Sequence, residues 1–206
     1  MSVEGTTRDA AYEAGATALL LVDMQSIWIE SEDHSEPAFR RHLAETIIPN
    51  QARLLAAARD SGVEVLYTII RSLTQDGRDR SLDHKLSSIH VPPDAPDGGV
   101  VGPLAPRGDE MVLWKTSSGV FNSTNIDSVL RTLGIRFLIV AGIMTDQCVD
   151  MAVRDGADRG YLVTCVDDAC ATYNDERHRA ALGAFGGYCW IADTPTVEAR
   201  LKALRR

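Results

Sequence analysis

The sequence predicts a three-layer α/β/α fold, in which helices cover both faces of a parallel β-sheet. First, short apolar runs recur along the chain, with too few polar residues for strands that have one face in water. Second, stretches with helical periodicity separate these runs, which is typical of a parallel sheet. Third, 206 residues, 45% of them hydrophobic, suffice for one substantial core. We therefore expect one domain across residues 1–206, with 1–15 as a flexible N-terminal segment.

The apolar runs predict six strands. Four runs are strong: residues 17–23 (TALLLVD), 63–70 (VEVLYTII), 137–142 (FLIVAG) and 161–166 (YLVTCV). Two runs are weaker, at residues 111–115 (MVLWK) and 188–192 (YCWIA). Continuous apolar character, rather than alternation, indicates strands that are buried on both faces.

Helices are predicted between the strands. Pro49 suits the first turn of a helix and Gly62 suits the position after its end. Further helical stretches are expected at residues 36–44, 126–133, 146–158 and 174–185. Residues 71–109 differ, because they hold five of the eight prolines and have weak periodicity. They are either a surface excursion or a loop that covers a site or an oligomer contact, and we favour the second because long loops are commonly functional.

The charge distribution excludes some classes of partner. A net charge of −8, spread along the chain, argues against nucleic acids and anionic membranes, because both require a basic patch. We expect no membrane-spanning segment and no secretory signal, since the first fifteen residues lack a basic start followed by an apolar stretch. A cytoplasmic protein that acts on a small molecule is the resulting expectation.

Three chemically active side chains follow predicted strands. Asp23 ends the first strand, Lys115 ends the run 111–115, and Cys148 follows the run 137–142 after a short turn. Ligands bind beyond the carboxyl ends of parallel strands. An acid, an ammonium group and a thiol are therefore expected to converge at one edge of the sheet.

Cys148 lies in the first turn of a predicted helix, where free N–H groups and the helix dipole favour a thiolate and can bind an oxyanion. If Thr145 is the N-cap, its hydroxyl occupies the Cys148 N–H, whereas an Asp146 cap leaves that N–H free. The alternative for Cys148 is a buried small hydrophobic residue. The same alternative is favoured for the cysteines that lack a first-turn position, Cys165, Cys170 and Cys189.

Asp23 and Lys115 also have simpler explanations when each is taken alone. A carboxylate after an apolar strand needs a partner, and Asp23 could cap the following turn. Lys115 could be a solvated strand end. The combination of all three residues favours an active site.

The segments around these residues resemble a known family. Asp23 in LLLVDMQ, Lys115 in WKTSSGVFNSTNID and Cys148 in VAGIMTDQCVDMAVRDG are similar, in order and spacing, to the isochorismatase-like cysteine hydrolases. These include nicotinamidase, N-carbamoylsarcosine amidohydrolase, biuret hydrolase and ureidoacrylate amidohydrolase. The resemblance runs from about residue 17 to about residue 194. It implies a Rossmann-like, six-stranded parallel sheet and a homo-oligomer, such as a dimer or tetramer.

The resemblance also implies roles. Asp23 would accept the thiol proton and later activate water, Lys115 would stabilise the ionised pair, and Cys148 would attack a carbonyl carbon. The backbone N–H groups of Met144 and Cys148 would hold the oxyanion, and a cis peptide bond would fall at Ile143–Met144. A thioester would form and water would cleave it.

Departures from the family pattern narrow the choice of reaction and of cofactor. The nicotinamidase branch carries an Asp/His metal cluster after the second strand, but here YTIIRSLTQDGRDRSLDHKL lacks the close ligand arrangement. His84 and His90 are therefore expected to be loop or surface residues, and we expect neither a metal nor another cofactor. His178 is expected at a helix surface or in packing. Isochorismatases that cleave a vinyl ether do not depend on the cysteine, so its presence favours amide chemistry.

Position in the chain suggests residues that line a substrate pocket. Arg71 could bind a substrate carboxylate through its planar guanidinium, or could pair with an acidic residue of the chain. The others are either pocket walls or ordinary packing. The full set of candidates is Gln25, Trp28, Arg71, Ser118, Phe121, Asn122 and Tyr173.

The sequence leaves three functions to compare. The leading hypothesis is a cysteine-dependent hydrolase of a small amide, ureido or carbamoyl C–N bond. The second is an isochorismatase-type vinyl-ether hydrolase. The third is a non-catalytic oligomeric binding protein that retains the fold, and the presence of all three residues argues against it.

Overall fold

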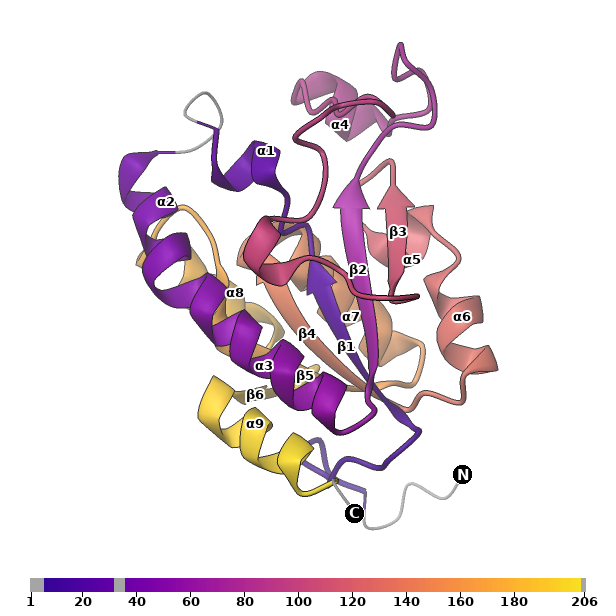
Figure 1. Ribbon diagram of the computed structural model, residues 1–206, viewed down its shortest axis with the longest axis vertical. Coiled ribbons are helices and arrows are strands. Elements are labelled where there is room, and N and C mark those ends of the chain that lie inside the picture. The colour runs from indigo at the N-terminus through magenta and orange to yellow at the C-terminus, as the bar shows by residue number, and fades with distance from the viewer. Residues whose placement is uncertain (1–5, 32–35, 205–206) are drawn as a thin grey trace.

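The computed structural model, which describes residues 6–31 and 36–204, contains a six-stranded parallel sheet (Figure 1). The strand order is β3-β2-β1-β4-β5-β6, and every pairing is parallel. This confirms the predicted fold class. The strands are β1 (Thr17–Val22), β2 (Glu64–Ile70), β3 (Met111–Lys115), β4 (Phe137–Ile143), β5 (Leu162–Ala171) and β6 (Trp190–Ala192).

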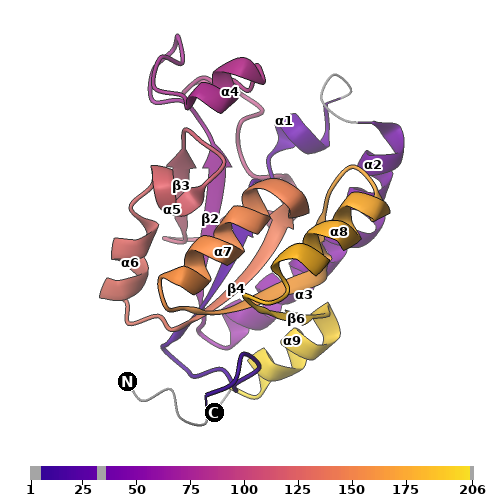
Figure 2. The ribbon, with the colours of Figure 1, turned by 180° about the vertical axis from the view of Figure 1, so that it is seen from behind.

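Helices cover both faces of the sheet. One face carries α3 (Ile48–Asp60) and α9 (Thr194–Lys202), which pack against each other (Figure 1). The opposite face carries α5 (Val120–Ser123), α6 (Ile126–Thr132), α7 (Asp150–Asp158) and α8 (Asp175–Phe185) (Figure 2). Among the described residues, none of the helices is long and apolar enough to cross a membrane.

The helix predicted to begin at Pro49 is the last part of a longer one. α2 (Pro37–His42) continues through a π-helical turn, η1 (Leu43–Ile47), into α3. A proline inside an α-helix lacks an N–H and clashes with the carbonyl four residues earlier. Here Ile48 donates instead to the carbonyl of Leu43, five residues back. The wider turn therefore lies directly before Pro49, and the two helices predicted separately are joined.

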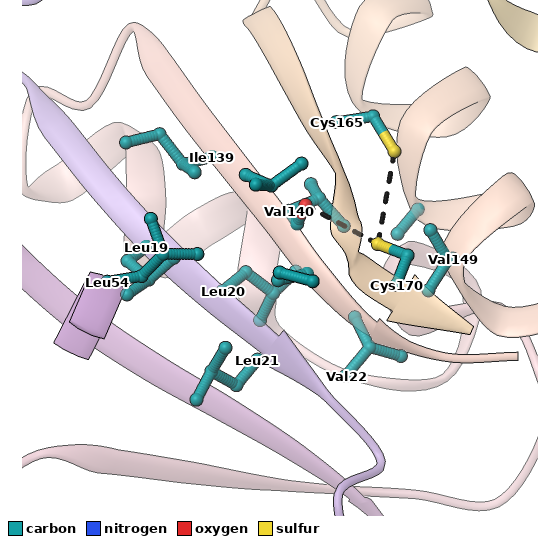
Figure 3. Packing of buried hydrophobic residues seen from close by; sticks show 14 of the residues in the cluster. Leu19, Leu20, Leu21, Val22, Leu54, Ile139, Val140, Val149, Cys165 and Cys170 are labelled. Atoms are coloured by element: carbon teal, nitrogen blue, oxygen red, sulfur yellow. Dashed lines mark hydrogen bonds between the residues drawn. The ribbon is translucent and has the colours of Figure 1, made fainter. Parts of the chain in front are cut away.

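Strand β5 is longer than predicted because it contains a bulge. Cys165 pairs with Val140 and Cys170 with Gly142, so five steps along β5 match two along β4. The two thiol sulfurs lie 4.0 Å apart in the core, and the Cys170 thiol also contacts the carbonyl of Val140 in β4 (Figure 3). Cys165, Cys170 and Cys189 are all buried, as predicted.

Gly142 allows β4 to approach β1 closely. It has a φ of 137°, and a Cβ at this position would lie 2.2 Å from the carbonyl oxygen of Val22. No side chain fits there without moving backbone. Gly142 therefore fixes the separation of β1 and β4 where both strands end.

The N-terminal segment is anchored within the described residues. Tyr12 is 7% exposed, and its hydroxyl donates to Thr164 Oγ1 at 3.0 Å. Its ring also packs edge-on against Phe137. Residues 1–5 of the segment that we expected to be flexible lie outside the described residues.

Candidate active site

The candidate site lies where the strand order changes direction. On one side of β1 lie β2 and then β3, and on its other side lie β4, β5 and β6. In open α/β sheets, this switch point opens a crevice at the carboxyl ends of the two central strands. Asp23 directly follows β1, and Cys148 lies in the turn that follows β4.

The structure brings Asp23, Lys115 and Cys148 together. Lys115 Nζ lies 2.8 Å from Asp23 Oδ2 and donates to Cys148 Sγ at 3.3 Å and to the carbonyl of Ser117 at 3.1 Å. The ammonium group is thus ion-paired with the carboxylate and donates hydrogen bonds to the sulfur and to the carbonyl oxygen. Thr68 Oγ1 donates to Asp23 Oδ1 at 2.9 Å, which fixes the carboxylate from the opposite side.

Burial and charge set the protonation of the site. Burial alone would lower the pKa of Lys115, but the Asp23 carboxylate and the Cys148 sulfur outweigh burial and raise it. Burial raises the pKa of the Cys148 thiol to about 12, with Lys115 opposing and Asp23 adding to the shift. The resting site thus holds an ammonium and a neutral thiol. The expectation of a thiolate favoured by the helix start is wrong here, because burial raises the pKa of the thiol.

Cys148 lies in a π-helical turn, η3 (Thr145–Val149), that leads into α7. Its N-cap is Met144, and no side chain caps the turn, so neither of the two predicted caps is correct. Thr145 Oγ1 instead bonds His178 Nδ1 at 2.9 Å, and Asp146 Oδ2 accepts from Arg177 Nε at 2.7 Å. Both residues therefore tie the turn that carries Cys148 to α8.

Two further features of this turn match the predictions. The Ile143–Met144 peptide bond is cis, as the resemblance implied. His178 contributes to packing between α8 and η3, because its ring bonds Thr145, and its pKa is lowered by burial.

A cavity of about 230 Å³ opens onto Asp23 and Cys148. Two of the predicted substrate residues, Trp28 and Tyr173, line it. Residues 87–90, within the long stretch 71–109, also line it, so this stretch covers the site, as we favoured. The wall residues that the sequence did not suggest are Ile70, Ser87, Ser88, Ile89, His90, Ile143 and Gln147.

Gln25 supports the wall without lining it. Its side chain is fully buried, donates to the carbonyls of Ile70 and Gly98, and accepts from the Ile70 N–H. It also accepts from Trp28 Nε1 at 3.1 Å. Gln25 therefore holds Trp28 in place and has no free hydrogen-bonding group for a substrate.

Arg71 does not line the cavity either. Its guanidinium lies 5.1 Å from the centre of the Trp114 ring, and Nη2 donates to the carbonyl of Ala95 at 3.1 Å. Neither of these contacts is with an acidic side chain, which was one of the two partners that we considered. Trp114 is partly exposed at the edge strand β3, which leaves its face available to the guanidinium.

Three more predicted wall residues lie elsewhere. Phe121 packs in the core against Tyr161, and Asn122 is exposed on α5. Ser118 contacts His84, with Oγ 3.3 Å from Nε2. A short sequence motif after Lys115 does not reveal which way the chain turns, so these positions could not be distinguished beforehand.

The two histidines of the long stretch lie near the site. His84, on α4 (Leu82–Leu86), is fully buried, contrary to our expectation, and its pKa is lowered by burial and by the nearby Lys115 charge. His90 lines the cavity. Across residues 6–31 and 36–204, no three His, Cys, Asp or Glu side chains are grouped so that they could hold a metal ion.

Comparison with known proteins places this geometry in a family. The isochorismatase domain model matches residues 17–195. The chain belongs to the isochorismatase family. It is thus an isochorismatase-family hydrolase, and the family model covers all six strands and the three site residues.

Individual relatives agree with this assignment. The chain is 34% identical to a probable inactive nicotinamidase of Arabidopsis thaliana, over 80% of this chain and 85% of the relative. It is 29% identical to the ureidoacrylate amidohydrolase RutB of Acinetobacter baylyi, over 86% and 80% of the two chains. A cysteine hydrolase structure from Pseudomonas syringae superposes with a TM-score of 0.84 at 26% identity, covering 95% of this chain and 96% of that one.

Proposed function

We propose that this protein hydrolyses a small amide, ureido or carbamoyl C–N bond through a thioester on Cys148. The observation that supports it most directly is the position of Lys115, which contacts both the Asp23 carboxylate and the Cys148 sulfur in a buried site. The similarity to an amidohydrolase and to a cysteine hydrolase supports the same reaction class.

The first half of the reaction forms the thioester. Asp23 accepts the proton of the neutral Cys148 thiol as the sulfur attacks the carbonyl carbon, so a free thiolate need not accumulate. Lys115 stabilises the negative charge that passes between carboxylate and sulfur. The tetrahedral intermediate then collapses, the C–N bond breaks, and protonated Asp23 returns its proton to the leaving nitrogen.

The oxyanion of the intermediate needs donors that are already oriented. The backbone N–H groups of Met144 and Cys148 lie at the start of η3, where helical N–H groups lack internal acceptors. No side-chain cap competes for them, because Thr145 and Asp146 are directed to α8. These two N–H groups are the proposed oxyanion hole.

The second half of the reaction releases the acid. Asp23, again a carboxylate, removes a proton from water as the water oxygen attacks the thioester carbon. The C–S bond breaks, and the proton returns to the departing sulfur. The products are a carboxylic or carbamic acid and ammonia or an amine, and the site returns to its neutral-thiol form.

Ammonia release from a panel of small amides, ureides and N-carbamoyl compounds tests this proposal. We expect Cys148→Ala and Cys148→Ser to abolish release, while Cys189→Ala, which removes a buried thiol outside the cavity, retains it. A covalent adduct on Cys148 trapped by acid quench and seen by mass spectrometry identifies the acyl-enzyme. Ammonia release that is undiminished in Cys148→Ala contradicts the mechanism.

A further inference from the structure

We propose that the acyl part of the substrate is uncharged, and that the cavity selects against amides that carry a carboxylate. This inference rests on the proposed function, because it names the substrate class of the same site. It depends on which charged groups the cavity wall can offer to a bound molecule.

The wall of the cavity combines apolar side chains with several polar groups and one carboxylate. Among the described residues, its lining contains neither lysine nor arginine. Its polar groups are the hydroxyls, amide and ring of Ser87, Ser88, Gln147 and His90, beside the acidic Asp23. The remaining wall, apart from Cys148, is formed by Trp28, Ile70, Ile89, Ile143, Met144 and Tyr173.

The nearest ammonium group is enclosed. Lys115 is fully buried, is ion-paired with Asp23, and donates hydrogen bonds to Cys148 and to the carbonyl of Ser117. A substrate carboxylate could reach this ammonium group only by displacing one of these partners. Displacing Asp23 or Cys148 would dismantle the catalytic arrangement itself.

Arg71 could have supplied a positive charge, but its guanidinium lies outside the cavity lining. Arg71 follows β2, whose last residue Ile70 lines the cavity, but its side chain stacks on Trp114 and donates to Ala95. Gly98 packs closely behind it, since a Cβ there would lie 2.3 Å from Nη2. These contacts hold Arg71 outside the cavity lining.

One ring nitrogen of His90, Nε2, is enclosed by protein. It has no hydrogen-bond partner among the described residues. A Cβ on Gly77 would lie 2.7 Å from this nitrogen, so Nε2 lies against Gly77.

The approach to the cavity has the same electrostatic character. A neighbouring depression shares Ser87, Ile89, Gln147 and Tyr173 with the cavity wall. Among its described lining residues, Arg154 is the basic one, and the acidic ones are Asp83, Asp146 and Asp150. Asp146 and Asp150 are ion-paired with Arg177 and Arg154, so Asp83 adds a negative charge there while the basic residue of the depression is already engaged.

Isosteric ligand pairs test the inference by binding. Calorimetry on Cys148→Ala compares benzene-1,4-dicarboxamide with 4-carbamoylbenzoate, and butanediamide with succinamate, so that each pair differs in charge at constant shape. Benzamide serves as a third, largely apolar ligand. We expect each uncharged member to bind about 100-fold more tightly, because a carboxylate buried without a partner is strongly disfavoured.

A charge-introducing variant provides the complementary test. Ser87 is exposed at the mouth and lines both hollows, so Ser87→Arg places a guanidinium beside the cavity, whereas Ser87→Gln adds length without charge. Both are made in the Cys148→Ala background. We expect Ser87→Arg to reduce the preference at least about tenfold and Ser87→Gln to leave it as it was.

The outcomes separate this inference from the proposed function. Equal or tighter binding of the carboxylate members overturns the inference, and so does the absence of binding by every uncharged compound. If the uncharged compounds bind with the expected preference but the intact enzyme releases no ammonia from them, the proposed reaction fails while the charge selection of the pocket stands.

Discussion

Replacing Lys115 by methionine removes the ammonium group but keeps most of the side-chain volume. Lys115 and Asp23 are fully or almost fully buried, so the variant leaves the carboxylate with Thr68 as its remaining side-chain donor. Breaking a buried ion pair in this way destabilises proteins by about 3–5 kcal/mol. For a domain of this size, where 1 kcal/mol corresponds to about 2–4 °C, the expected decrease in Tm is roughly 6–20 °C.

The matched control removes both charges. Asp23→Asn combined with Lys115→Met leaves no uncompensated ion, and Asn is nearly isosteric with Asp. We expect the double variant to be more stable than Lys115→Met alone, because most of the loss in the free energy of unfolding comes from a carboxylate that is buried without a cation. Urea denaturation at pH 7, followed by circular dichroism, gives the free energies of unfolding. A single variant within 1 kcal/mol of wild type, or a double variant no more stable than the single, refutes the reasoning.

Three other predictions test separate parts of the site. A Cys148 pKa of about 12 leaves roughly 10⁻⁴ of the thiol ionised at pH 8, so its alkylation by iodoacetamide should accelerate about tenfold per pH unit up to pH 10; a plateau below pH 9 contradicts this. Gly142→Ala should lower the free energy of unfolding by at least about 2 kcal/mol in the same denaturation assay, because the added Cβ would clash with the backbone of Val22. Gly187→Ala is the control and should have little effect, because open space surrounds that position. Thr68→Val should reduce kcat about tenfold by freeing the Asp23 carboxylate, with the fold intact by circular dichroism; an unchanged kcat would show that this hydrogen bond does not orient the base.

The fold and the grouping of Asp23, Lys115 and Cys148 were predictable from the sequence for the same reason. Buried parallel strands have a strong apolar signal, and their carboxyl ends share one edge, so Asp23, Lys115 and Cys148 could be placed together before their contacts were known. The bulge in β5 was missed because Asp167 and Asp168 end the apolar run, whereas the strand resumes its pairing with β4 at Cys170.

The cavity wall was much harder to predict. Residues 87–90 reach it through a stretch without periodicity, whose path is set by tertiary contacts. Arg71 follows β2, as expected, yet it stacks on Trp114, and nothing in the local sequence indicates that choice. The protonation of Cys148 was wrong for a different reason: the helix start is visible in the sequence, but the extent of burial is not.

The ion pair between Asp23 and Lys115 also bears on how the protein folds. β2 lies between the strands that carry these residues, so the pair requires both the β1–β2 and β2–β3 alignments. Such a non-local contact is entropically costly to establish early along a folding route. Interactions absent from the transition state slow unfolding and leave the folding rate nearly unchanged. The same two charges that define the chemistry are therefore expected to lengthen the lifetime of the folded chain.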